Sequence, residues 1–144
     1  MAGFITDDGV GYLLGLFGNR ESVVPTYYLT LTRSVPAPYM SVEDLDEVDA
    51  EDYLRAAYSN DGSTWTLSLD TLANAHEVTF PVAGTDWGDV TGWALLDTSD
   101  VGTGRILYGG DLATTWTIEA DTQPVMEPGQ LSVTISVSDW ALEG

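Results

Sequence analysis

The stretch TFPVAGTDWGDVTGWALLD, residues 79–97, decides the fold class of this 144-residue chain. Trp87 and Trp93 lie six residues apart among glycines, and an apolar run over 90–96 includes the second of them. A short apolar run bounded by turn residues is typical of a strand that is buried on both faces. We expect Gly88 and Asp89 to form a turn, with Trp93 in the strand behind it and Trp87 covering the core from the turn. Both tryptophans are interpreted mainly as core residues, because aromatic side chains fill the space between two thin sheets.

The segments on either side carry the same strand signal. Residues 25–32 alternate between apolar and polar positions, and residues 131–138 give the cleanest alternation of all, with Leu131, Val133, Ile135 and Val137 on one face. The other expected strands cover 53–59, 65–69, 75–80, 105–112 and 114–120. A proline-rich connection is expected over 34–42. About eight short strands with little helix favour an antiparallel β-sandwich of the jelly-roll kind.

A short helix is expected in residues 1–20, ahead of the strands. Thr6 or Asp7 would cap its first turn, and the acidic side chains would lie at its positive end. Its internal glycines make it a poor helix in isolation, so it must be held by packing on something else. We therefore predict one domain over 1–144, with a docking helix followed by a β-sandwich over 21–144.

Charge is the strongest signal in the composition. The chain has 23 acidic residues against four arginines and no lysine, which gives a net charge of −19. Such a charge repels phosphate groups, so no nucleic-acid partner is expected. No apolar run approaches the length needed for membrane insertion. The chain has no cysteine, which excludes disulfides and thiolate metal sites, and the lack of lysine excludes Schiff-base chemistry.

Residues suited to catalysis or metal binding are sparse. His76 is the only histidine and lies in no nucleophile motif, so we interpret it as a surface or half-buried residue. Seven of the ten residues 43–52 are acidic, which predicts a solvated loop. Calcium is the alternative for this run and for the loop with Asp97 and Asp100, although neither has EF-hand spacing. No cofactor is otherwise expected.

Aromatic residues beside polar loops leave a carbohydrate-binding interpretation open. Exposed tryptophan or tyrosine rings can stack on sugars, and the candidates are Trp65, Trp116, Trp140 and Tyr39. Packing in the core or against another subunit is the favoured interpretation of these residues.

One group of motifs resembles a known family. These are Phe80-Pro81, Asp86-Trp87-Gly88, Ala94-Leu95-Leu96-Asp97, Gly102 with Gly104, and Ile106-Leu107-Tyr108-Gly109. In this order and spacing they are similar to small bacteriophage structural proteins of the tail-fibre-like or minor tail kind. The resemblance spans most of the chain, with residues 35–75 following it loosely and the acidic run replacing a small-residue linker. It brings no active site with it.

The resemblance implies a non-enzymatic virion protein, made in the host cytoplasm, that assembles with other virion proteins and with its own copies, a trimer being one form. The tail tip or fibre base is the expected position. A capsid decoration protein is the alternative, and a carbohydrate-binding receptor module is a weaker one. The partner-binding candidates are Tyr12, Leu13, Leu16, Phe17, Trp87 and Trp140.

Overall fold

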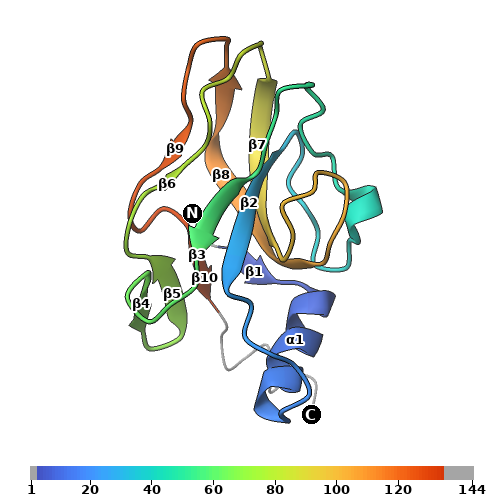
Figure 1. Cartoon of the computed structure of the whole chain (residues 1–144), viewed down its shortest axis with the longest axis vertical. Coiled ribbons are helices and arrows are strands. Elements are labelled where there is room, and N and C mark those ends of the chain that lie inside the picture. The colour runs from blue at the N-terminus through green and yellow to red at the C-terminus, as the bar shows by residue number, and fades with distance from the viewer. Residues whose placement is uncertain (1–2, 135–144) are drawn as a thin grey trace.

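The computed structural model describes residues 3–134, which form one short α-helix and a set of β-strands (Figure 1). The strands are β1 (Gly3–Ile5), β2 (Thr26–Thr32), β3 (Ala56–Ser59), β4 (Trp65–Ser68), β5 (Thr71–Asn74), β6 (Val78–Thr79), β7 (Gly88–Leu96), β8 (Ile106–Ile118), β9 (Val125–Met126) and β10 (Ser132–Thr134). The helix α1 (Asp7–Phe17) follows β1, and a 3-10 helix η1 (Val42–Asp44) lies in the acidic segment. The all-β class with a short N-terminal helix is confirmed.

Eight of these strands form a single sheet in the order β3-β2-β7-β8-β1-β10-β5-β4, and β6 pairs with β9 in a small second sheet. Neighbouring strands are antiparallel except β1 and β10, which are parallel. The large sheet curls, so that its two end strands approach each other. The rings of Tyr58 in β3 and Trp65 in β4 meet edge to face, with centroids 5.1 Å apart. A side-chain contact therefore joins the two edges where backbone pairing does not.

The quoted stretch supplies the centre of the sheet. Trp93 in β7 is fully buried and Trp87 is 1% exposed, so both are core residues as predicted. The strand begins at Gly88, two residues earlier than expected, and Gly88 and Asp89 pair with β8 instead of forming a turn. The indole of Trp93 lies over Gly3 and Gly110, where a Cβ atom would come within 2.7 Å of the ring. The flat ring fits because these neighbours have no side chain.

Several strand boundaries differ from the sequence prediction. Residues 106–118 form one continuous strand instead of two, with a positive φ of 66° at Ala113 in place of a turn. The strand expected over 75–80 is reduced to β6, and residues 71–74 form β5, which was not predicted. β1 was not predicted either, because three residues are too few to show a period. The final strand is confirmed through Thr134, and the part predicted beyond it lies outside the described residues.

The helix has the predicted cap. The Thr6 side chain accepts a hydrogen bond from the Gly9 amide at 3.0 Å, and α1 ends at Phe17 with Gly18 after it. The helix lies on its own sheet, mainly against β8. The contact is close at Gly9, where a Cβ atom would lie 2.0 Å from the Leu107 carbonyl oxygen. A glycine that weakens the isolated helix thus permits the docking that holds it.

Candidate functional site

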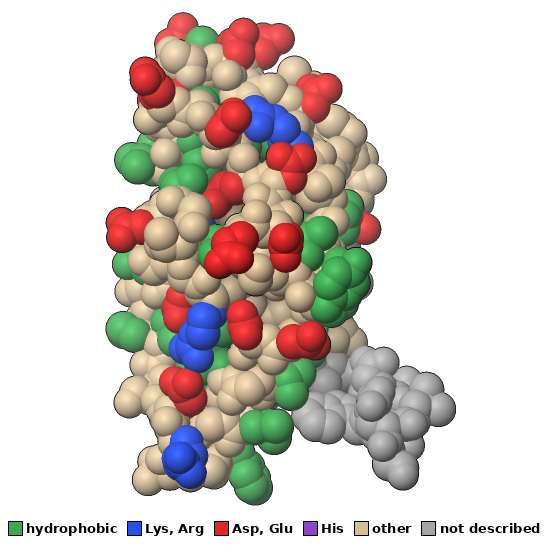
Figure 2. All heavy atoms as spheres, turned by 90° about the vertical axis from the view of Figure 1, so that its right-hand side faces the viewer, with side chains coloured by type: hydrophobic (Ala, Val, Ile, Leu, Met, Phe, Trp, Pro, Cys, Tyr) green, Lys and Arg blue, Asp and Glu red, His purple; other side chains and the backbone are tan. Residues whose placement is uncertain are grey.

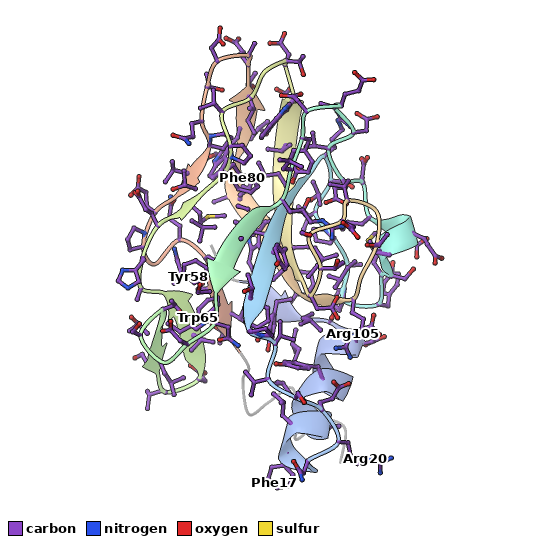
Figure 3. The ribbon with its side chains drawn as sticks, in the orientation of Figure 1. Phe17, Arg20, Tyr58, Trp65, Phe80 and Arg105 are labelled. Carbon is purple, nitrogen blue, oxygen red and sulfur yellow. The ribbon has the colours of Figure 1, made fainter. Side chains whose placement is uncertain are left out.

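Exposed apolar side chains gather at one end of the molecule, where α1 and the β4–β5 hairpin lie (Figures 1 and 3). We call this surface the apolar end. It consists of the exposed side chains of Leu14, Phe17, Val23, Leu67 and Leu69. Phe17 is 94% exposed and Leu69 is 98% exposed. Large apolar side chains that gain nothing from burial in their own chain are typical of contact surfaces.

A cavity of about 310 Å³ opens between α1 and the hairpin. Leu13 lines it from the helix, whereas Trp65, Leu67 and Leu69 line it from β4 and the hairpin turn. The remaining lining is also mostly apolar, with Asp70 as its one acidic residue. This hollow therefore suits an aliphatic or aromatic side chain better than a polar ligand.

Arg105 fixes the position of the helix relative to the sheet. Its Nε donates to Asp97 at 2.9 Å, and its Nη1 donates to Glu21, just after the helix, at 3.0 Å. The guanidinium also lies over the ring of Tyr12, 5.7 Å from the centroid. The Tyr12 hydroxyl accepts from the Val24 amide at 2.8 Å. These contacts tie the connection between α1 and β2 to the loop before β8.

The acidic segment 43–52 is more ordered than a solvated loop. Arg55, whose side chain is fully buried, donates from Nε and Nη2 to the two carboxylate oxygens of Glu47 at 2.7 and 2.9 Å. Its Nη1 donates to the carbonyl oxygens of Thr98 and Thr103. Glu47 also accepts from the Thr30 hydroxyl and the Gly102 amide. The pair thus joins the acidic segment to β2, β3 and the loop before β8.

The electrostatics of this pair favour the charged form. Burial would raise the pKa of Glu47, but hydrogen bonds from Arg55 and Thr30 and the charge of Arg55 hold that pKa below its ordinary value. The solvated-loop interpretation is therefore wrong for Glu47. It is also wrong for Val48, which is 1% exposed and belongs to the core.

Asp52 is a second residue of the acidic segment, besides Glu47, that has a structural role. Its carboxylate accepts from the Thr85 hydroxyl at 2.6 Å, from the Gly84 amide and from the Trp87 indole at 3.3 Å. The hydrogen bond from Thr85 is the largest cause of the lowered pKa of this carboxyl. Asp52 therefore orders the loop that leads into the Trp87 region.

The predicted partner-binding residues fall into three groups. Tyr12 and Trp87 are each 1% exposed, and their side chains pack inside their own chain. Leu13 and Leu16 are half-buried against the core, while Phe17 projects from the end of the helix (Figure 3). Trp140 lies outside the described residues. The structure thus places Phe17 at the apolar end and Leu13 in the lining of the cavity.

Sequence reasoning missed the hairpin contribution to this end. Leu67 and Leu69 were interpreted as part of an alternating strand, but Leu-Asp is not a usual turn pair, so the hairpin was not recognised. The signal that was available is the apolar alternation of Trp65, Leu67 and Leu69 in an uncharged segment.

The carbohydrate candidates are spread over the surface. Trp65 and Trp116 are half-buried, and Tyr39 is 78% exposed. A shallow hollow of about 270 Å³ beside Trp116 also includes Thr117, Thr122 and Gln123. Trp65 instead donates its indole N–H to Asn60 and contacts Tyr27 and Tyr58. Trp65 and Trp116 line different hollows, so these two rings do not form a shared platform, and Trp140 lies outside the described residues.

Acidic side chains are scattered over the face that carries the acidic segment, with arginines among them, and hydrophobic side chains show at several places, including the helix end (Figure 2). Within residues 3–134, no group of three or more His, Asp or Glu side chains is placed to hold a metal ion. Among the carboxylates considered for calcium, Glu47 pairs with Arg55 and Asp97 with Arg105. His76 is exposed. None of the described helices is long and apolar enough to cross a membrane.

Comparison with known proteins gives a family for this chain. Residues 12–134 match the family described as podophage GP4 fiber I protein gp80. The chain belongs to this phage fibre family. The match runs from α1 to the end of β10 and includes both sides of the cavity. The phage tail-fibre-like family suggested by the sequence motifs is thus confirmed. Among curated proteins, no sequence matches this chain.

Proposed function

We propose that this protein is a structural component of a bacteriophage tail fibre that acts through protein–protein contacts and not through catalysis. The observation that carries the proposal is membership of a phage fibre family over residues 12–134. A fold serves many functions, so the specific role has to be argued from the surface.

The distribution of rigidity and exposure supports a contact role. The acidic segment and the loop before β8 are joined by the Arg55–Glu47 pair, and α1 is tied to the sheet through Arg105. The Arg105 contacts hold α1, which carries Leu14 and Phe17, in a fixed position on the sheet. A preformed apolar surface lowers the entropic cost of association, because few side chains and loops have to be ordered when a partner binds.

A position at the tail tip or fibre base, next to other virion proteins, is our proposal for the finer role. Its negative surface favours partners with basic rims around an apolar centre, because opposite charges attract and like charges destabilise a contact. Assembly with its own copies, including as a trimer, is part of the same proposal.

Copy number in purified virions tests this role. Quantitative mass spectrometry against the major capsid protein should give a small number of copies per particle, as a tail component requires. Hundreds of copies per particle would instead support a capsid decoration protein. Absence from purified particles would contradict a structural role in the virion altogether.

A further inference from the structure

Leu69 lies at the tip of the β4–β5 hairpin in a backbone conformation that leucine rarely adopts. Ser68 and Thr71 face each other across the hairpin, so Leu69 and Asp70 are the two turn residues, and φ of Leu69 is 56°. A positive φ at this position favours glycine, asparagine or aspartate. The Leu69 side chain is 98% exposed, so its own chain gives it almost no burial in return. A strained, exposed leucine indicates a contact outside the chain.

The strand that leads to this turn is an open edge of the large sheet. The Ala75 amide donates to the Thr64 carbonyl at 2.8 Å, and the register then directs the backbone groups of Trp65 and Leu67 away from β5. Among the described strands, none pairs with β4 on that side. β4 also has none of the lysine, proline or charged residues that protect edge strands. This edge can therefore accept another strand.

Charge decides which surface can meet a second copy. A net charge of −19 makes two copies of this chain repel each other over most of their surface. Residues 62–69 carry no charge at all. Two copies can approach along this segment without setting carboxylates against each other.

We propose that β4 pairs in antiparallel register with β4 of a second copy of this chain, about a two-fold axis beside Leu67. In this register Leu67 faces its own equivalent, and Leu69 comes beside the partner's Trp65. Asp70 faces the partner's Thr64, so no acidic residue of β4 or its turn opposes another. The same patch is used on both subunits, as a two-fold contact requires.

The proposed contact would bury apolar side chains in addition to forming backbone hydrogen bonds, because β4 lies beside the apolar cavity. Trp65, Leu67 and Leu69 line the cavity of about 310 Å³, so pairing at β4 brings three apolar side chains of each copy to its mouth. Backbone pairing supplies direction, and the leucines supply burial. If the chain has no other contact with its own copies, the β4 contact makes a dimer. If the chain also forms a trimer, the contact links two trimers through one subunit of each. It deepens the proposed function and rests on it, since it names a second copy as the partner at the apolar end.

Sedimentation of the purified chain over a range of concentrations tests the contact. We expect a monomer–dimer equilibrium that shifts toward dimer as salt is raised, because salt screens the repulsion between acidic copies. Leu69→Asn removes the apolar side chain but suits the positive φ, so the variant should dissociate at about tenfold higher concentration while melting no lower than the wild type. Wild-type protein that stays monomeric, or Leu69→Asn dimerising like it, would overturn the proposal.

Two variants at Leu67 test the backbone pairing and its register. Leu67→Pro removes an amide that faces away from β5, so it should weaken the dimer more than Leu67→Ala, which keeps that amide. If Leu67→Pro fails to fold, Leu69→Asn still decides. Because the chain has no cysteine, Leu67→Cys gives a single thiol that should form a disulfide-linked dimer on oxidation. Ser63→Cys, outside the strand, is the matched control, and equal cross-linking of the two would refute the two-fold register.

These results are separable from the proposed function. If the chain is found at low copy number in virions but stays monomeric in solution, the β4 contact is refuted and the fibre role stands. If it is absent from virions, the fibre role fails whatever its solution mass.

Discussion

Arg55 donates two hydrogen bonds to the Glu47 carboxylate in a site that solvent scarcely reaches, with side chains 0% and 7% exposed. Glu47 belongs to the acidic run 43–52, whose charge predicts a solvated loop, whereas Arg55 follows it in the segment 53–59 that was predicted as a strand. The pair replaces that loop by a fixed connection between β2, β3 and the loop before β8. It therefore links the most acidic part of the chain to the stability of the fold.

Glu47→Gln should destabilise the protein by about 3 kcal/mol at neutral pH, because it leaves the buried charge of Arg55 without its counter-ion. Urea unfolding followed by tryptophan fluorescence measures this loss. Glu43→Gln is the matched control, since Glu43 is exposed, and it should change the free energy of unfolding little. Equal effects of the two substitutions would show that the Arg55 pair does not stabilise the fold.

The contribution of Glu47 should also depend on pH. Its pKa in the folded protein lies below the ordinary 4.5, so the folded state favours the charged form. The stabilisation is present above that ordinary value and is lost as pH falls through the folded-state pKa. The difference in unfolding free energy between wild type and Glu47→Gln should therefore be constant from pH 7 to about pH 5 and shrink below it. A difference that grows on acidification would contradict the assignment.

Two glycines of α1 should respond oppositely to the same substitution. A Cβ atom added at Gly11 would have no neighbouring atom within 4 Å, so Gly11→Ala should stabilise the protein by about 0.5–1 kcal/mol through helix propensity. At Gly9 the new Cβ would lie 2.0 Å from the Leu107 carbonyl oxygen, so Gly9→Ala should destabilise by about 2 kcal/mol or more. Thermal unfolding of both variants checks the prediction. A stabilising Gly9→Ala would show that α1 does not dock on β8 as described.

The Trp93 ring should make Gly110 sensitive to substitution. A Cβ atom at Gly110 would lie 2.7 Å from the indole, so Gly110→Ala should cost about 1–3 kcal/mol and alter the near-ultraviolet circular dichroism. Gly62 has open space around it and is the control position. Similar stabilities for Gly110→Ala and Gly62→Ala would argue against this packing.

The sequence predicted an element correctly where several consecutive residues carried the periodicity of a strand or the capping signal of a helix. The apolar run 90–96 predicted a buried strand, and the pair Thr6 and Asp7 predicted the start of the helix, which Thr6 caps. β1 has only three residues, too few to show a period, and β8 was predicted as two strands that met at Ala113, whose positive φ does not interrupt the strand. Local pattern cannot show which distant ring lies above a glycine.

The contact surface was less predictable than the fold. Phe17 was predicted to bind a partner and is exposed at the end of α1, whereas Tyr12 and Trp87, predicted with it, are buried. Leu69 was not among the predicted candidates, because its positive φ at the tip of a hairpin is not visible in the sequence. The partner of Glu47 was missed for a similar reason, since one arginine among many acids does not show which of them it binds.

Location of the chain in intact virions tests the central claim most directly. Gold-labelled antibody against this protein, viewed with purified particles by electron microscopy, should mark the tail or its fibres and leave the capsid shell unlabelled. Label spread over the shell, or particles that contain none of the protein, would contradict the account.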